Sequence, residues 1–346
     1  MATFNGKNLK ITIDGESHSK SMNLVAHNFP SFNYDESLLL EFLDRRKAST
    51  FNFSTKRNEN DIPSVKLENG VLSATILNGD VKSGDYDELR GKPRPSHADY
   101  CWHVKNGVYD FTGGGRFSGR LTSMLCVAGG LAIQYLNKMG IFIGAYVSQV
   151  GGVFGDSYKN KKFSFSELVK LREGDAPSLS NKQEMLLEIE KASKNGDSVG
   201  GRIDAVVYGL KAGYGDNLFE GLEGKISTLI YSIPAVKGVE FGAGFDFCGM
   251  VGSASNDQMY YNGDKVDFYT NNAGGINGGI SNGNDITLSV AVRPTPSISK
   301  EQNTVDLINK ENTKISIKGR HDACIVLRAV PCVESAIALA ILDEIL

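Results

Sequence analysis

Three of the five histidines of this chain, His18, His97 and His321, lie in short polar segments. The unperturbed pKa of histidine is about 6.5, so this side chain can give or take a proton near neutral pH. Each of the three has an acidic residue within two positions, and two of them have an arginine nearby. If the three segments meet in the fold, they form a proton-transfer site suited to an anionic substrate.

One of these segments combines arginine with proline. Pro95 restricts the backbone at Arg94, so the loop can present a guanidinium and the His97 imidazole in a fixed relation. The alternative is a surface loop in which Asp99 caps a helix.

Two other segments join arginine to residues that shape the backbone. Three glycines at 113–115 precede Arg116, Arg120 and an expected helix. Glycine permits close backbone approach, and a helix N-terminus offers unpaired N–H groups to a phosphate. The segment suggests a phosphate-binding loop, although three glycines also mark tight turns. At 293–297, two prolines enclose a threonine at the end of a strand, which indicates a rigid sheet exit or a wall for a cofactor ring or phosphate.

Several common catalytic motifs are absent from the sequence. It has no GxxxxGK[ST] loop, no GxGxxG after a strand and no HExxH, which weakens the ATPase, Rossmann oxidoreductase and zinc hydrolase classes. Residues 15–19 approach the GxSxG motif of serine hydrolases, but Ser19 replaces the last glycine. That motif also requires a strand-turn-helix deep in a parallel sheet, so a serine hydrolase is the weaker alternative.

Hydrophobic periodicity predicts the elements that position these residues. Asp35 can cap a helix, and the Asn69-Gly70 pair predicts a hairpin over 65–77. The other expected helices cover 118–138, 180–194 and 332–346, and the other expected strands cover 9–13, 141–147, 202–210 and 285–293. Helices and strands alternate without regular βαβ spacing, which favours the α+β class. Because histidine segments occur near both ends, we expect one functional unit over residues 1–346.

Composition limits the possible partners. With 37 basic and 40 acidic residues, the net charge of −3 argues against binding to bulk nucleic acid or a membrane surface. Any anion site must therefore be a local arginine cluster. No stretch approaches the roughly 18 apolar residues that span a bilayer, and the N-terminus has no apolar signal core. The five cysteines form no CxxC pair, which predicts reduced thiols of a cytoplasmic protein and no zinc site.

Six segments, in their order along the chain, carry a family resemblance. They are GESHS at 15–19, RPSHADY at 94–100, GGGRFSGR at 113–120, NNAGGINGGIS at 271–281, RPTPS at 293–297 and GRHDAC at 319–324. A weaker match is DSVGGR at 197–202. Together they resemble the chorismate synthase family over nearly the whole chain. The resemblance implies a β-α-β sandwich assembled as a homotetramer, and an anti-1,4-elimination of phosphate from 5-enolpyruvylshikimate 3-phosphate that requires reduced FMN (FMNH2) without net redox change.

The resemblance also implies roles for single residues. His18 is expected to donate a proton to the departing phosphate, His97 to protonate or hold the reduced flavin, and Asp322 to assist removal of the C6 proton through the flavin N5. Substrate contacts are implied for Ser17, Arg46, Arg94, Arg116 and Arg320. Flavin contacts are implied for Arg116, Phe117, Ser118, Pro234, Ala235, Gly278, Arg293, Pro294, Thr295, Pro296, Ser297 and Arg320. No metal ligands are expected.

The chain departs from the family pattern at several positions. Ser19 and Ser96 replace glycines beside two of the histidines, which could tighten the loops or add hydroxyl contacts. The other departures are Asn52 for arginine, Phe117 for serine, Leu121 for glutamate and Asn272 for histidine, while Arg57 and Glu59 are retained. The residues proposed for proton transfer are intact, so we expect activity with altered affinity.

Two alternatives remain within this resemblance. One is a flavin-binding protein without elimination activity, against which the intact His18, His97 and Asp322 count. The other is a bifunctional enzyme that reduces its own flavin with NADPH. The chain lacks obvious extra segments for a nicotinamide, so we expect it to depend on an external flavin reductase or another source of reduced flavin.

Overall fold

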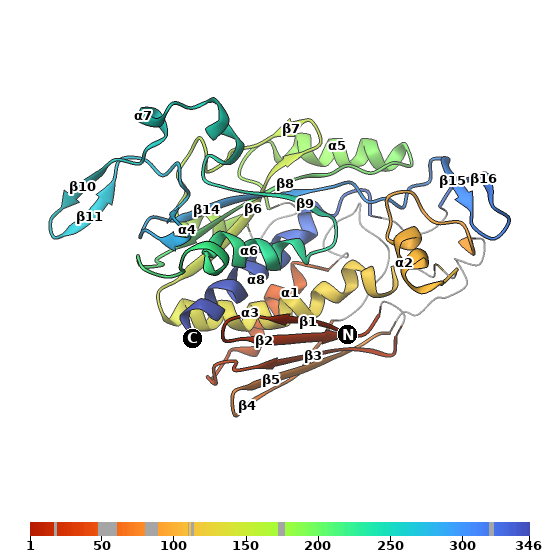
Figure 1. Cartoon of the computed structure of the whole chain (residues 1–346), viewed down its shortest axis with the longest axis horizontal. Coiled ribbons are helices and arrows are strands. Elements are labelled where there is room, and N and C mark those ends of the chain that lie inside the picture. Colours follow the sequence, from red (N-terminus) through yellow and green to blue (C-terminus); the bar gives the residue numbers. More distant parts are fainter. Residues whose placement is uncertain are drawn as a thin grey trace.

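The computed structural model describes residues 1–16, 19–47, 61–79, 89–109, 111, 114–171, 177–317 and 322–346. Within this part of the chain, a layer of helices lies between two five-stranded sheets (Figure 1). One continuous set of buried apolar side chains includes residues of both sheets and of the helices between them. The expected α+β sandwich is therefore confirmed.

The first sheet is formed by the N-terminal part of the chain. Its strands are β1 (Ala2–Asn5), β2 (Lys10–Asp14), β3 (Ser21–His27), β4 (Ser64–Glu68) and β5 (Val71–Leu77), in the antiparallel order β1-β2-β3-β5-β4. Every second residue of β3 and β5 is buried, which is the pattern of a sheet with one face on the core and the other toward solvent. The β4–β5 hairpin turns at Asn69 and Gly70 as predicted, and both residues have positive φ angles.

The second sheet is buried more completely. Its strands are β6 (Phe142–Val150), β7 (Val153–Phe154), β8 (Gly201–Tyr208), β9 (Val236–Phe241) and β14 (Ile286–Val292), in the antiparallel order β7-β6-β8-β14-β9. Helix α8 (Val326–Ile345) contacts β6 and β8, and α4 (Phe165–Lys170) and α5 (Lys182–Lys194) also contact β6. The runs of buried residues in β6 and β8 follow from this cover, and β14, which lies between β8 and β9, is also mostly buried.

The helical layer is built around α8, which packs against α3 (Thr122–Lys138) and α6 (Leu222–Tyr231). Helix α1 (Glu36–Asp44) packs on α3, and the Asp35 carboxylate caps it by accepting from the Ser37 and Leu38 N–H groups. Almost every residue of α8 is buried, as expected for a helix that is apolar on all sides.

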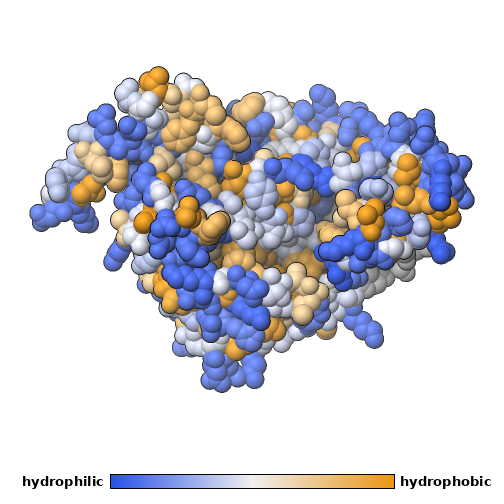
Figure 2. All heavy atoms as spheres, in the orientation of Figure 1, coloured by the Kyte–Doolittle hydropathy of each residue, from blue (hydrophilic) through white to orange (hydrophobic). Residues whose placement is uncertain are grey.

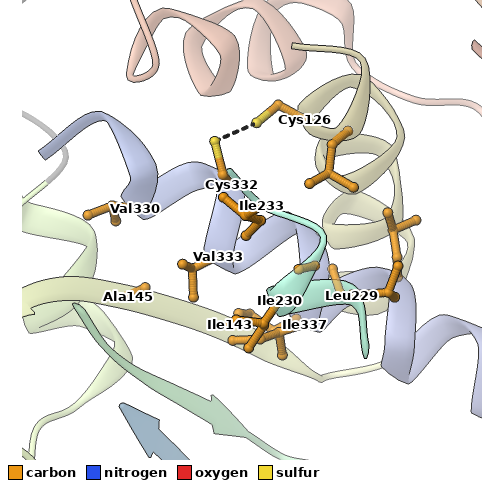
Figure 3. Close-up of a cluster of buried hydrophobic side chains, with 14 of the residues drawn as sticks. Cys126, Ile143, Ala145, Leu229, Ile230, Ile233, Val330, Cys332, Val333 and Ile337 are labelled. Carbon is orange, nitrogen blue, oxygen red and sulfur yellow. Dashed lines mark hydrogen bonds between the residues drawn. The ribbon is translucent and has the colours of Figure 1, made fainter. Parts of the chain in front are cut away.

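Helices α3 and α8 approach each other closely. A Cβ added at Gly129 would lie 2.1 Å from the Cβ of Ser335, so this crossing requires glycine. One turn earlier the sulfur atoms of Cys126 and Cys332 lie 3.7 Å apart (Figure 3). The hydrogen bond from Cys126 lowers the pKa of Cys332 to about 7, while burial raises the pKa of Cys126.

The remaining elements lie at the edges of the sandwich. They are α2 (Asp99–Asn106), the short 3₁₀ turns η3 (Gly115–Phe117), η4 (Gly119–Leu121), η6 (Leu218–Glu220) and η7 (Gly244–Gly249), the short helix α7 (Gly252–Ser255), and the hairpins β10 (Met259–Asn262) with β11 (Lys265–Phe268), β12 (Ile276–Asn277) with β13 (Ile280–Ser281), and β15 (Gln302–Asp306) with β16 (Glu311–Ile315). The β10–β11 hairpin projects from one end of the body, and β15–β16 lies at the opposite end (Figure 1). None of the helices in the described part of the chain has the length and apolar character needed to cross a membrane.

Two helix starts differ from the sequence prediction. Helix α8 begins at Val326, six residues before the predicted start at 332, and contains Pro331 in its interior. The helix expected over 118–138 begins at Thr122, because η3 and η4 occupy the preceding residues. The other predicted elements are present with small shifts of their ends.

Replacing Asp343 by alanine is expected to destabilise the fold by about 3 to 5 kcal/mol. Its buried carboxylate, in the last turn of α8, accepts from the backbone N–H groups of Lys7, Asn8 and Leu9 at 2.7–2.9 Å. Without it, three donors beside β2 lose their acceptor. Urea unfolding measures the change. Glu190→Ala, which breaks a helix-surface pair with Lys194, is the control and should change stability by less than about 0.5 kcal/mol. A loss below about 1 kcal/mol in Asp343→Ala would contradict this role.

Candidate active site

The segment that carries His97 folds into a compact charged cluster at the start of α2. Asp99 is buried, and its carboxylate accepts from the Arg94 backbone N–H (3.0 Å), from Arg94 Nε (2.7 Å) and from Arg94 Nη2 (2.8 Å). His97 Nδ1 lies 2.6 Å from the same carboxylate. This contact uses Nδ1, so a proton transferred by His97 must pass through Nε2. Asp99 is thus not the helix cap that the sequence left as an alternative, because the cap position belongs to Ala98.

The charge of Asp99 depends on this cluster. Burial alone would raise the pKa of Asp99, but hydrogen bonds from Arg94 and His97 outweigh it and lower the pKa to about 2. The backbone of Ser96 supports the cluster in a left-handed conformation, with φ of 59°, which glycine adopts more easily. The replacement of the family glycine by Ser96 therefore places strain beside His97.

The lowered pKa of Asp99 predicts a pH dependence of stability. The unfolded carboxyl titrates near its ordinary value of 3.8, so the ionised form stabilises the fold above about pH 4. That contribution, roughly 2 kcal/mol, is lost as the pH falls from about 4 to about 2. Urea unfolding of the wild type and Asp99→Asn should show a stability difference that shrinks over this range. A difference independent of pH would contradict the assignment.

Arg116 connects the first histidine segment to helix α2. Its guanidinium lies 3.4 Å from the Glu16 carboxylate, in the first histidine segment, and 4.8 Å from the ring centre of Trp102 on α2. Phe117 packs edge-on against the same tryptophan, with ring centres 5.3 Å apart. Ser118 caps η4 by accepting from the Arg120 N–H. Phe117, which replaces the family serine, therefore packs on the same tryptophan ring that Arg116 contacts.

Residues flanking the first histidine are held by a closed turn. The Ser19 hydroxyl accepts from the Glu16 N–H at 3.0 Å and lies 2.6 Å from the Ser21 carbonyl oxygen. Asn78 donates to the Ser19 carbonyl at 2.7 Å and accepts from Arg120 Nε at 3.3 Å. The hydroxyl added at Ser19 therefore closes the turn.

A buried group of two arginines and one carboxylate lies between α1 and α3. Arg46 and Arg120 each form an ion pair with Asp61, one with each carboxylate oxygen. Burial would raise the pKa of Asp61, but the two guanidinium groups outweigh it and lower the pKa. Among the described residues, Arg46 Nε has no hydrogen-bond partner. Asp61 thus holds two guanidinium groups beside each other, and guanidinium groups pair well with carboxylate and phosphate oxygens.

Asp322 is held by contacts from two segments. Its carboxylate accepts from Arg328 Nη1 at 2.6 Å, and its backbone carbonyl accepts from the Thr295 hydroxyl at 2.7 Å. The carbonyl of Thr295 in turn accepts from the Ser198 hydroxyl at 2.7 Å. These contacts bring together the GRHDAC, RPTPS and DSVGGR segments.

Further predicted flavin positions lie where β14 ends and the neighbouring strand β9 begins. The Arg293 N–H donates to the carbonyl of Ala235, whose φ of 74° is unusual for alanine. Burial lowers the pKa of Arg293, and its buried Nε has no partner among the described residues. An arginine with an unsatisfied buried donor fits the phosphate of a flavin mononucleotide. Pro234 precedes Ala235, and Pro294, Pro296 and Ser297 belong to the same 293–297 segment.

Gly278 lies apart from this group, in the turn between β12 and β13. The adjacent Gly279 accepts from the Leu222 N–H at the start of α6. A Cβ added at Gly278 would meet no atom within 4 Å, and its φ is 62°. Three of the expected site residues, Ser17, His18 and Arg320, lie outside the described residues, as do Asn52, Arg57 and Glu59. Within the described residues, no cluster of histidine, cysteine, aspartate or glutamate could hold a metal ion.

Sequence reasoning did not find Asp61, Arg328 or Trp102. Arg328 gives a weak signal, because it is the single charged residue in an otherwise apolar stretch, 323–333. Asp61 gives none, since its two partners lie 15 and 59 positions away. Trp102 has no motif around it beyond its place after the RPSHADY segment.

Together, the α+β sandwich and the paired arginines and carboxylates are typical of an enzyme that acts on an anionic small molecule. Comparison with known proteins narrows this class. A profile described as chorismate synthase matches residues 9–346. Curated relatives named chorismate synthase include those of Methanosarcina mazei (39% identical, covering 99% of this chain and 95% of the relative) and Archaeoglobus fulgidus (40% identical, 99% and 96%). The chain belongs to the chorismate synthase family, a lyase family of aromatic amino-acid biosynthesis through the shikimate pathway.

A solved structure supports the fold independently. A crystal structure of chorismate synthase superposes with a TM-score of 0.76 at 22% identity, covering 98% of this chain and 92% of that one. At this identity the likeness concerns the fold. Both sheets and the helical layer therefore follow the architecture of that enzyme.

Proposed function

We propose that this chain converts 5-enolpyruvylshikimate 3-phosphate to chorismate by anti-1,4-elimination of the C3 phosphate and the C6 hydrogen. The observation that carries the proposal is a network of hydrogen bonds and ion pairs that links the family segments. Glu16 contacts Arg116, and Asn78 joins Ser19 to Arg120. Asp61 then bridges Arg120 and Arg46. Arg328 then contacts both the Arg46 carbonyl and the Asp322 carboxylate, and Thr295 contacts the Asp322 carbonyl.

The substrate carries two carboxylates and a phosphate, so its binding requires several cations. We assign this role to Arg46, Arg94, Arg116 and Arg320, with Ser17 beside them, because the planar guanidinium matches carboxylate and phosphate oxygens in pairs. Asp61 and Asp99 already pair with two of these arginines. The two carboxylates hold the guanidinium groups in place before a substrate binds.

Two proton movements must accompany the elimination. The phosphate is a poor leaving group while dianionic, and its second pKa is about 6. We assign His18 as the donor of a proton to it. The C6 proton is only weakly acidic, and we assign its assisted removal to Asp322. His97, fixed by Asp99, is assigned to hold or protonate the reduced flavin through Nε2.

The flavin residues proposed are Arg116, Phe117, Ser118, Pro234, Ala235, Gly278, Arg293 to Ser297 and Arg320. They would hold reduced FMN, whose chemistry would be the transient supply of an electron that eases loss of phosphate. Two observations support this assignment: Arg293 contacts Ala235, and no described residue is a hydrogen-bond partner of the Arg293 Nε.

Replacing Arg293 by alanine is expected to weaken FMN binding at least ~10-fold, because a charge-assisted contact to phosphate is lost. Titration of the protein with FMN, followed by flavin fluorescence, measures the change without turnover. Arg90→Ala, at an exposed turn, is the control and should leave the affinity unchanged. Equal affinities in both variants would remove Arg293 from the flavin site.

We also propose that the active form is a homotetramer. Large apolar side chains are exposed along 218–269, among them Phe219 (94% exposed), Phe245 (79%) and Tyr261 (79%). Figure 2 shows hydrophobic side chains gathered over the projecting part of the molecule near η7 and α7. Exposed apolar surface of this kind usually marks a protein contact. Sedimentation equilibrium should report four subunits for the wild type and smaller species for Phe245→Ser. A wild-type monomer would contradict the proposal.

The whole chain, residues 1–346, is proposed to act as one unit in the cytoplasm, supplied with reduced flavin by an external reductase. The continuous core and the network that links residues near both ends support a single unit. Turnover with oxidised FMN and NADPH alone, without a reductase, would contradict dependence on an external reductant.

The elimination itself is tested anaerobically. The purified protein is mixed with chemically reduced FMN and 5-enolpyruvylshikimate 3-phosphate, and chorismate and phosphate are followed together. Equal appearance of both products, absent with oxidised FMN, is the expected result. Flavin binding without either product would instead favour a non-catalytic flavin protein.

A further inference from the structure

Arg328 is a partly buried arginine at the first turn of α8 that none of the sequence motifs includes. Its guanidinium joins two residues of the site. Nη1 donates to the Asp322 carboxylate at 2.6 Å, and Nε donates to the backbone carbonyl of Arg46 at 3.0 Å. The side chains of Arg328 and Asp322 are 18% and 14% exposed, so both charges lie largely out of water.

Because the guanidinium is rigid, these two contacts together fix the Asp322 carboxylate relative to the Arg46 backbone. The guanidinium nitrogen atoms lie in a rigid plane, so the directions from Nε and Nη1 are fixed relative to each other. The Asp322 carboxylate is therefore held at a set position relative to the end of α1, where the Arg46 side chain leaves toward Asp61. The backbone of Asp322 is fixed separately by Thr295. A lysine could supply the charge but not the two directions.

A purely structural role for Arg328, joining α1 to α8, is already filled by another residue. Arg45 donates from Nη1 and Nη2 to the buried Glu334 carboxylate of α8 at 2.6 and 3.0 Å. That pair fastens the end of α1 to α8 through two charge-assisted hydrogen bonds. The contact from Arg328 to Asp322 adds nothing to this junction, because Asp322 precedes α8. What it fixes is the carboxylate.

We propose that Arg328 is a positioning residue. It holds the Asp322 carboxylate at a fixed position relative to Arg46, which we assign to substrate binding. The inference rests on the proposed function, in which Asp322 assists removal of the C6 proton. Arg328 then acts on the rate of proton removal through Asp322. We expect little effect on substrate affinity, because the Nε and Nη1 donors are directed at protein oxygens.

The test compares Arg328→Gln, Arg328→Lys, Asp322→Asn and the double variant Arg328→Gln/Asp322→Asn. Arg328→Gln should lower kcat ~10- to 10²-fold with less than ~3-fold change in KM, because misplacing a proton-transfer group affects the chemical step. The deuterium isotope effect on kcat, with substrate labelled at C6, should rise because proton removal becomes slower. Arg328→Lys should recover part of the rate. The double variant should be no slower than Asp322→Asn alone, since Arg328 acts only through that carboxylate.

Arg45→Lys is the matched control, because it weakens the neighbouring arginine–carboxylate pair between α1 and α8. It should lower the melting temperature and leave kcat and the isotope effect unchanged. If Asp322→Asn is slow but Arg328→Gln and Arg328→Lys keep the kcat and isotope effect of the wild type, the role of Arg328 is overturned and that of Asp322 is not. Independent, multiplying losses in the double variant overturn it as well. Full turnover in Asp322→Asn removes Asp322 from the proposed function, and the role of Arg328 with it.

Discussion

Asp322→Asn is expected to slow chorismate formation at least ~10²-fold while the protein still folds and binds flavin. Asparagine has nearly the same shape, and its amide oxygen can still accept from Arg328 Nη1. The Thr295 contact is made by the backbone carbonyl and survives the substitution. What is lost is the charge and basicity of the carboxylate, so the defect should appear in kcat.

Single-turnover assays with reduced FMN measure this rate, and FMN titration and thermal unfolding check the fold. Asp197→Asn is a suitable control, because it removes another carboxylate of the same region, one paired with Lys300 at the surface. The control should keep its rate and change stability by less than about 1 kcal/mol. Near-full turnover in Asp322→Asn would exclude Asp322 from the proton transfer.

Local features of the fold could be predicted from sequence because their causes are local. Asp35 caps α1 through its own side chain, and Asn69-Gly70 adopts the positive φ angles that its turn requires. The predicted start of α8, at residue 332, is wrong. In the structure Pro331 lies inside α8, where burial of its neighbours outweighs the hydrogen bond that proline cannot make.

The residues of the candidate site likewise divide into those with a local sequence signal and those without one. Motifs singled out Arg94 and Asp322, because each belongs to a segment with its own pattern, and the family resemblance implied Arg46. The groups that hold them were not found from sequence, since they depend on contacts between distant parts of the chain. Arg328, for example, meets the Arg46 carbonyl across 282 positions. Periodicity and motif spacing carry no information about such a pair.

The two serines beside the histidines show what a family pattern leaves open. The Ser19 hydroxyl closes the turn at Glu16, whereas the Ser96 backbone takes a left-handed conformation in which a Cβ is disfavoured. The same replacement of glycine by serine thus adds a contact at one position and strain at the other. Sequence alone gave the two positions the same interpretation, because the difference lies in φ.

His18→Ala is expected to lose at least ~10²-fold in rate near neutral pH, with flavin binding retained. His18 lies outside the described residues, but the residues on either side are anchored to the arginines of the third segment. Glu16 contacts Arg116, and Ser19 is joined to Arg120 through Asn78. Removing the imidazole therefore removes a proton donor and leaves its surroundings in place.

The pH dependence of His18→Ala distinguishes this role from a structural one. The second pKa of a phosphate monoester is about 6, so below that pH the leaving group already carries the proton that His18 would supply. The defect of His18→Ala should therefore shrink as the pH falls from 8 toward 5.5, measured as kcat relative to the wild type. His27→Ala, at the exposed end of β3, serves as the control and should match the wild type throughout. A defect that stays constant over this range would mean that His18 does not protonate the phosphate, even if the variant is slow.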